Sequence, residues 1–90
     1  MSCQYRVEVT REFEKEFKSL TKKNKRFSES ILKAIDQIRR NPEIGKPLSG
    51  PLAGKRSKRV ESVFRIIYKV DGERKTVILL TVKHRKTVYG

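Results

Sequence analysis

Apolar and polar residues follow two different periods in the first part of the chain. Residues 4–10 alternate between the two kinds, which is the period of a half-buried strand. Thr10 can then cap a helix over 11–20, in which apolar residues recur three and four positions apart. The charged residues of this segment, Glu16 among them, are expected on the solvated face of the helix. The pattern predicts a strand followed by an amphipathic helix.

A second helix and three further strands are expected after it. The helical period resumes over 27–38 and ends at Asn41-Pro42, because proline excludes the preceding residue from helix. The segment 41–54 contains all three prolines and is expected to be an ordered loop. Three strands with a hairpin signal at Asp71-Gly72 are then predicted. They cover residues 55–60, 63–70 and 75–83.

These elements define one domain over residues 1–90, since a chain of this length holds a single core. The fold class is α+β with the order β-α-α-β-β-β. Because each helix has one apolar stripe, the two are expected as a hairpin on one face of a four-stranded, largely antiparallel sheet. Alternation in the strand 63–70 puts Phe64, Ile66 and Tyr68 on the core face and Arg65 on the open face.

The net charge of the chain indicates what kind of partner it binds. The formal net charge is +13, from 23 Lys and Arg against 10 Asp and Glu. Such an excess exceeds what solubility requires and indicates an anionic partner, and nucleic acid is favoured because no basic amphipathic membrane helix is evident. Without a transmembrane or signal segment, the protein is expected in the cytoplasm. A single cysteine, Cys3, and a single histidine, His84, give no plausible zinc ligand set.

The chain contains three distinctive motifs, which are the run Asn41-Pro42-Glu43-Ile44-Gly45-Lys46-Pro47-Leu48, the strand Phe64-Arg65-Ile66-Ile67-Tyr68 and the ending His84-Arg85-Lys86-Thr87-Val88-Tyr89. Together they resemble the RelE branch of the RelE/ParE toxin superfamily. Gly50-Pro51-Leu52 and Arg59-Val60 fit the same pattern. With the order of elements, the likeness extends over essentially the whole chain.

This resemblance implies a microbial RNase-like fold and a toxin of a type II toxin-antitoxin system. Such toxins enter the ribosomal A site and cut mRNA by attack of a ribose 2′-OH on the adjacent phosphate. The reaction needs a base, an acid for the departing 5′-oxygen, and cations for the phosphorane. The implied partners are a RelB-like antitoxin, the ribosome and mRNA, with no membrane, metal or small-molecule cofactor.

The resemblance also implies catalytic residues. Arg65 matches the central-strand arginine, whose planar fork suits a phosphate. Arg85 matches an arginine that stabilises the leaving group or the phosphorane, and Lys83 is a second candidate for that role. Tyr89 matches a tyrosine that stacks on a base or orients the 2′-hydroxyl. His84 faces the other way from Lys83 by strand alternation, so a structural role is expected for it.

The catalytic base is expected within the basic run 55–59, and two alignments compete. An ungapped alignment to Arg65 selects Arg56 and Lys58, whereas alignment of Arg59-Val60 to the family pattern selects Lys55 and Arg59. Strand alternation allows only one set to face the site. Lys58 is favoured, because lysine can lose its proton and arginine cannot. The remaining basic residues of this region and of the C-terminus are expected to bind RNA: Lys55, Arg56, Arg59, Lys83 and Lys86.

Two other functions fit the same elements. One is a ParE-like protein that poisons DNA gyrase by binding and has no nuclease activity. The other is a noncatalytic RNA-binding module, which would follow if Lys58, Arg65 and Arg85 point in different directions. The endoribonuclease is favoured by the basic strand and by the Arg85 and Tyr89 ending.

Overall fold

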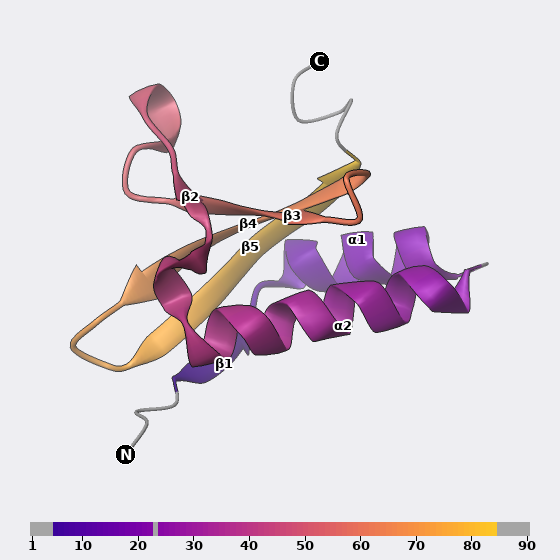
Figure 1. The fold of residues 1–90 in the computed structure, drawn as a ribbon, viewed down its shortest axis with the longest axis horizontal. Coiled ribbons are helices and arrows are strands. Elements are labelled where there is room, and N and C mark those ends of the chain that lie inside the picture. Colours follow the sequence, from indigo (N-terminus) through magenta and orange to yellow (C-terminus); the bar gives the residue numbers. More distant parts are fainter. Residues whose placement is uncertain (1–4, 23, 85–90) are drawn as a thin grey trace.

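A computed structural model describes residues 5–22 and 24–84 of the chain (Figure 1). It contains two α-helices, two short 3-10 turns and five strands. In chain order these are β1 (Arg6–Val9), α1 (Arg11–Thr21), α2 (Lys25–Arg40), η1 (Pro42–Ile44), β2 (Lys46–Pro47), η2 (Gly50–Leu52), β3 (Arg56–Val60), β4 (Phe64–Asp71) and β5 (Thr76–His84). The α+β class is confirmed, and the four predicted strands occur in the predicted order along the chain.

The five strands form one mixed sheet in the order β1-β5-β4-β3-β2. β1 lies parallel to β5, and the other neighbours are antiparallel. The predicted count of four strands was one too few, because the two-residue strand β2 lies inside the segment expected to be a loop. A strand of two residues, one of them proline, has no period that could reveal it.

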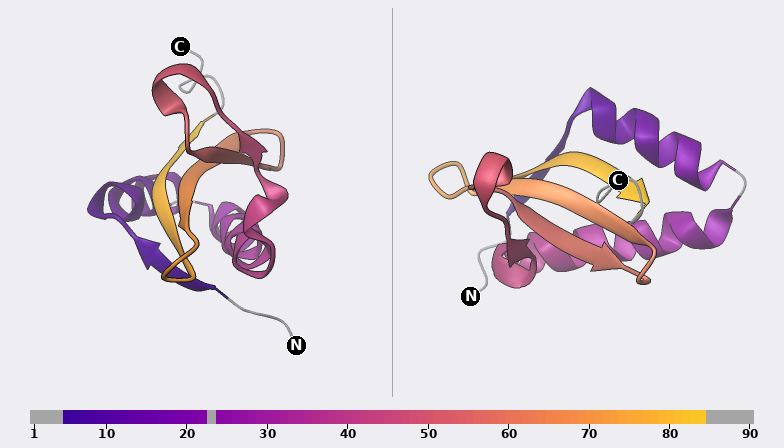
Figure 2. Two further views of the ribbon diagram at one scale, coloured as in Figure 1. Left: turned by 90° about the vertical axis from the view of Figure 1, so that its left-hand side faces the viewer. Right: turned by 90° about the horizontal axis from the view of Figure 1, so that it is seen from above.

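Both helices lie on one face of the sheet and form a V that closes at their connection (Figure 2). Thr10 caps α1 by accepting a hydrogen bond from the amide of Phe13 at 3.1 Å, as the sequence predicted. Asn24 caps α2 by accepting one from the amide of Phe27 at 3.3 Å. Because of this cap, α2 begins at Lys25, two residues earlier than the apolar period indicated.

The core lies between the helices and the sheet. Its largest fully buried side chains include Tyr68 and Ile66 on β4, with Ile31 and Ile38 on α2. Phe64, Ile66 and Tyr68 face the helices as predicted. No described helix packs on the opposite face of the sheet, which carries Arg65. We call this the open face.

Tyr68 also attaches the segment before β2 to the sheet. Its hydroxyl donates to the carbonyl of Pro42 at 2.7 Å and accepts from the amide of Gly45 at 2.9 Å. A Cβ at Gly45 would lie 2.5 Å from the Tyr68 hydroxyl, so only glycine fits there. Arg56, the cross-strand neighbour of Tyr68, donates to the Gly45 carbonyl at 2.8 Å. Together these contacts fix the start of β2 beside β3.

The turn between β3 and β4 sets the register of these two strands. Its residues Glu61 and Ser62 both have positive φ, at 52° and 62°, and the Val63 amide donates to the Val60 carbonyl at 3.1 Å. Asparagine and glycine usually occupy such positions, because other residues pay a steric cost. Glu61 is held by a hydrogen bond from Ser30 and lies 3.8 Å from Arg26, both on α2. Contacts with the helix thus support an otherwise unfavourable turn.

Candidate nucleic-acid interface

Three cations from three adjacent strands lie side by side on the open face of the sheet. The register pairs Arg59 of β3 with Arg65 of β4, and Arg65 with Lys83 of β5. Directly paired residues project to the same face, about 4.5–5.5 Å apart at Cβ. We call Arg59, Arg65 and Lys83 the cationic row. Like charges directly opposite each other destabilise a sheet, so we expect an anion to bind and neutralise them.

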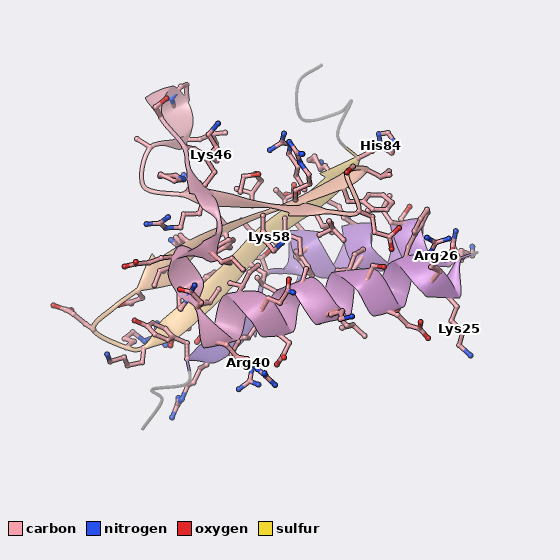
Figure 3. All side chains as sticks on the ribbon, viewed as in Figure 1. Lys25, Arg26, Arg40, Lys46, Lys58 and His84 are labelled. Atoms are coloured by element: carbon pink, nitrogen blue, oxygen red, sulfur yellow. The ribbon has the colours of Figure 1, made fainter. Side chains whose placement is uncertain are left out.

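Arg65 occupies the centre of the cationic row and is partly buried. Its Nη1 donates at 3.3 Å to the hydroxyl of Ser57, which lies two residues from Arg59 along β3. Ser57 itself is buried and pairs with Lys46 of β2. Lys46 therefore projects to the same face, on the side of the sheet away from the helices (Figure 3). The central guanidinium is thus held by a neighbouring strand, and Lys46 adds a further cation to the same face of the sheet.

Lys83 ends the cationic row and is paired with Glu16 of α1. The same carboxylate accepts hydrogen bonds from the Thr81 hydroxyl and from the Val82 amide. Burial alone would raise the pKa of the Glu16 carboxyl, but the hydrogen bonds from Lys83, Thr81 and Val82 outweigh it and lower that pKa. The hydrogen bond to Glu16 raises the pKa of the Lys83 ammonium, so Lys83 stays charged at neutral pH. This fits a phosphate-binding role better than that of a base.

Lys58, the predicted base, does not lie in the cationic row. Its register partner is Ile66 in the core, so its side chain is on the helix face of the sheet. It lies over α2 beside Lys33 and Gln37, and its ammonium donates to the Arg59 carbonyl at 3.1 Å (Figure 3). The prediction that Lys58 lies beside Arg65 is therefore wrong. Residues 61–63 connect the two strands, and the resulting register pairs Arg59, not Lys58, with Arg65.

The other basic residues of this run divide between the two faces in the same way. Arg56 lies on the helix face, where it donates to the carbonyls of Gly45 and Glu43. It anchors the loop, so the expected contact of Arg56 with RNA is not supported by its position. Lys55 precedes β3, and alternation puts it on the side of Ser57. The structure thus favours the second alignment, which selected Lys55 and Arg59.

His84 packs against the core, and its ring lies 5.8 Å from that of Phe64 in an edge-to-face contact. The prediction that it faces away from Lys83 is confirmed by the register, which pairs it with Phe64. Three predicted residues of the C-terminal ending lie outside the described part of the chain, and their roles stay predictions. They are Arg85, Lys86 and Tyr89.

A second surface lies on the helix side of the sheet. It is an apolar groove of roughly 300 Å³ within the V of the helices, and its exposed apolar members are Val9 and Leu32. Within residues 5–22 and 24–84, no group of three His, Cys, Asp or Glu side chains could hold a metal ion. The described helices include none that is long and apolar enough to span a membrane.

Three residues of this site were not identified from the sequence. Ser57 lies at the position that faces Arg65, where a lysine was expected. Lys46 was assigned to a loop, and only its pairing with Ser57 reveals its place. Glu16 was assigned to the solvated face of α1, yet its side chain is only 19% exposed. No local pattern marks these positions, since each depends on contacts between distant segments.

Comparison with known proteins finds a matching family model and several similar proteins. The model of the ParE toxin of type II toxin-antitoxin systems matches residues 7–89. A Methanocaldococcus jannaschii protein named as toxin RelE4 is 29% identical over 85 residues, covering 94% of this chain and 90% of the relative. A chain of the RelBE2 toxin-antitoxin complex from Mycobacterium tuberculosis is 31% identical, with a TM-score of 0.78 over 91% of this chain and 92% of that chain. The YoeB/ParE toxin of Agrobacterium tumefaciens shares the fold, with a TM-score of 0.79 and 23% identity over 89% of this chain and 98% of that chain.

Proposed function

This chain belongs to the ParE toxin family of type II toxin-antitoxin systems, within the RelE/ParE superfamily, and we propose that it is an endoribonuclease that cuts mRNA in the ribosomal A site. The observation that carries the proposal is the cationic row. Arg59, Arg65 and Lys83 stand on the open face at a cost in stability that bound phosphate would remove. An RNA backbone supplies such phosphates.

In the proposed reaction, the 2′-oxygen of a ribose bonds to the adjacent phosphorus and the bond to the 5′-oxygen breaks. The products are a 2′,3′-cyclic phosphate and a 5′-OH. Arg65, fixed by Ser57, binds the non-bridging oxygens, and Arg59 and Lys83 add positive charge as the phosphorane forms. We assign stabilisation of the leaving group or the phosphorane to Arg85 and stacking on a base to Tyr89. The departing 5′-oxygen takes its proton from solvent water.

The base in this proposal is Lys55 rather than Lys58. Lys58 is directed to α2, and Arg59 is unsuited because arginine side chains do not act as proton acceptors in proteins. Lys55 is the lysine of the run 55–59 that alternation puts on the side of Arg65. A Lys55→Met variant should therefore lose cleavage, whereas Lys58→Met should retain it. Equal loss in both variants would reject this assignment.

The proposed partners follow from the charge and from the relatives. The M. tuberculosis relative was solved in a toxin-antitoxin complex, and we expect a RelB-like antitoxin here. Its segment over the cationic row should be acidic, because a carboxylate can replace phosphate between arginines. The ribosome and mRNA are the proposed targets, so the protein is expected to act in the cytoplasm.

A gyrase poison is the second candidate, and the match to the ParE family model favours it. The cationic row favours the nuclease, because binding to gyrase does not require phosphate chemistry. Incubation with ribosome-bound mRNA, with free RNA and with gyrase plus supercoiled DNA separates the functions. Cleavage of ribosome-bound mRNA is expected. Gyrase-dependent DNA breaks with intact mRNA would establish the alternative, and RNA binding without either product would leave a noncatalytic module.

A further inference from the structure

Glu16 is a partly buried carboxylate at the edge of the proposed phosphate site. All three of its observed partners belong to β5, namely the Thr81 hydroxyl, the Val82 amide at 3.1 Å and the Lys83 ammonium. One carboxylate oxygen accepts from Thr81 and Val82, and the other accepts from Lys83. The side chain is therefore fixed by the backbone of β5 as well as by its ion pair.

The topology of the sheet explains why α1 can reach this strand. β1 pairs with β5 only as far as Leu79, so within residues 5–22 and 24–84 no strand pairs with the rest of this edge of β5. The Thr10 hydroxyl shares its proton between the carbonyls of Leu79 and Leu80, which lie 3.0 and 2.9 Å from Oγ1, and Glu16 accepts from Val82 further along. Two residues of the same helical segment thus satisfy polar groups on the edge of β5.

A carboxylate at this place would ordinarily weaken a phosphate site, because it repels the phosphate. Glu16 nevertheless contacts the cation at the end of the cationic row, and Lys83 keeps 36% of its side chain exposed. An ammonium has three protons, so one can bind Glu16 while the others remain for a second acceptor. The arrangement holds a long, flexible side chain in one position.

We propose that Glu16 is a positioning residue, which fixes the Lys83 ammonium at the edge of the cationic row so that it can bind an RNA phosphate together with Arg65. The inference rests on the proposed function, because it requires that RNA binds this face. If Glu16 has this role, removal of its negative charge weakens RNA binding. Simple electrostatics predicts the opposite sign, since removal of a carboxylate strengthens attraction to RNA.

The test measures the affinity for a single-stranded RNA oligonucleotide by fluorescence anisotropy. Glu16→Gln keeps an acceptor for Thr81 and Val82 but loses the ion pair. Glu14→Gln is the matched control, because it removes the same charge from an exposed site on α1. We expect Glu16→Gln to weaken binding about threefold or more, whereas Glu14→Gln leaves binding unchanged or slightly tighter. Binding by Glu16→Gln as tight as that of Glu14→Gln would overturn the proposal.

A double-mutant cycle separates positioning of Lys83 from a general effect on the fold. In a Lys83→Met background, Glu16→Gln should cause no further weakening, because its effect passes through the ammonium. A weakening of the same size in that background would contradict the proposal. Thermal melts of every variant establish that it is folded.

Two further measurements keep this inference distinct from the proposed function. In the wild-type protein, NMR signals of the Lys83 side chain should shift when the oligonucleotide binds, and unshifted signals would reject the role of Lys83 even if Glu16→Gln fails to fold. Arg65→Ala tests the site itself. If Arg65→Ala weakens binding and Glu16→Gln does not, only the role of Glu16 fails. If Arg65→Ala has no effect on binding, the proposed function fails as well.

Discussion

Arg59 and Arg65 lie directly opposite each other in the β3–β4 ladder, with both side chains on the open face. Like charges in this position oppose folding by roughly 0.2–1 kcal/mol. The sheet therefore gives up stability where the RNA phosphate is proposed to bind, as binding sites commonly do.

Arg59→Thr should raise the free energy of unfolding by about 0.5 kcal/mol, because it removes this repulsion and adds a β-branched residue. The same variant should bind RNA more weakly. Urea titration and anisotropy measure the two effects. Lys69→Thr is the control, since Lys69 is exposed on β4 and pairs with Ile78 rather than with a cation. Equal stabilisation by both variants would show that repulsion between the arginines contributes nothing.

The hydroxyl of Tyr68 is the main link between the sheet and the loop before β2. Tyr68→Phe leaves the Pro42 carbonyl and the Gly45 amide without this buried partner, so we expect a loss of about 1–3 kcal/mol. Tyr5→Phe should change stability by no more than about 0.5 kcal/mol. Chemical denaturation of both variants checks the difference. A neutral Tyr68→Phe variant would mean that these hydrogen bonds do not hold the loop.

The turn at Glu61 and Ser62 offers a stabilising substitution. Ser62→Gly removes the steric cost of a positive φ, although it also increases the freedom of the unfolded chain, so a net gain of about 0.5–1 kcal/mol is expected. Thermal denaturation measures this gain. Ser49 has a φ of −128°, so the same change there should destabilise the protein. If both substitutions lower the melting temperature, the turn is not strained.

The Glu16 and Lys83 pair makes stability depend on pH. Because the folded protein lowers the pKa of the Glu16 carboxyl, this contribution is present above the unfolded value near 4.5 and is lost as pH falls through the folded pKa. Because folding raises the pKa of Lys83, the same pair also loses its contribution as pH rises through that folded pKa. Melting temperatures between neutral pH and about pH 3 should fall less steeply for Glu16→Gln than for wild type. Parallel curves would contradict this.

Most of the fold could be predicted from the sequence because its signals are local. The cap at Thr10, the apolar stripes of both helices and the alternation in β4 each depend on neighbouring residues. The face of Arg65 followed from the same alternation. These features do not depend on contacts with distant segments of the chain.

The rest of the site depended on register, which the sequence leaves open. The turn at 61–63 lacks the glycine that would identify its type, and a shift of one residue there exchanges the faces of Lys58 and Arg59. Lys46 required the pairing of a two-residue strand with β3. Glu16 required knowledge that β1 ends before β5 does. None of these relations has a short-range signature.

The central claim is that Arg65 takes part in mRNA cleavage, and primer extension on mRNA from a purified translation system tests it most directly. Wild-type protein should produce cuts at codons in the ribosomal A site. Arg65→Ala should remain folded and produce none, while Arg74→Ala, which removes an exposed arginine paired with Glu8, should cut as wild type does. Cleavage by folded Arg65→Ala at the wild-type rate would contradict the account.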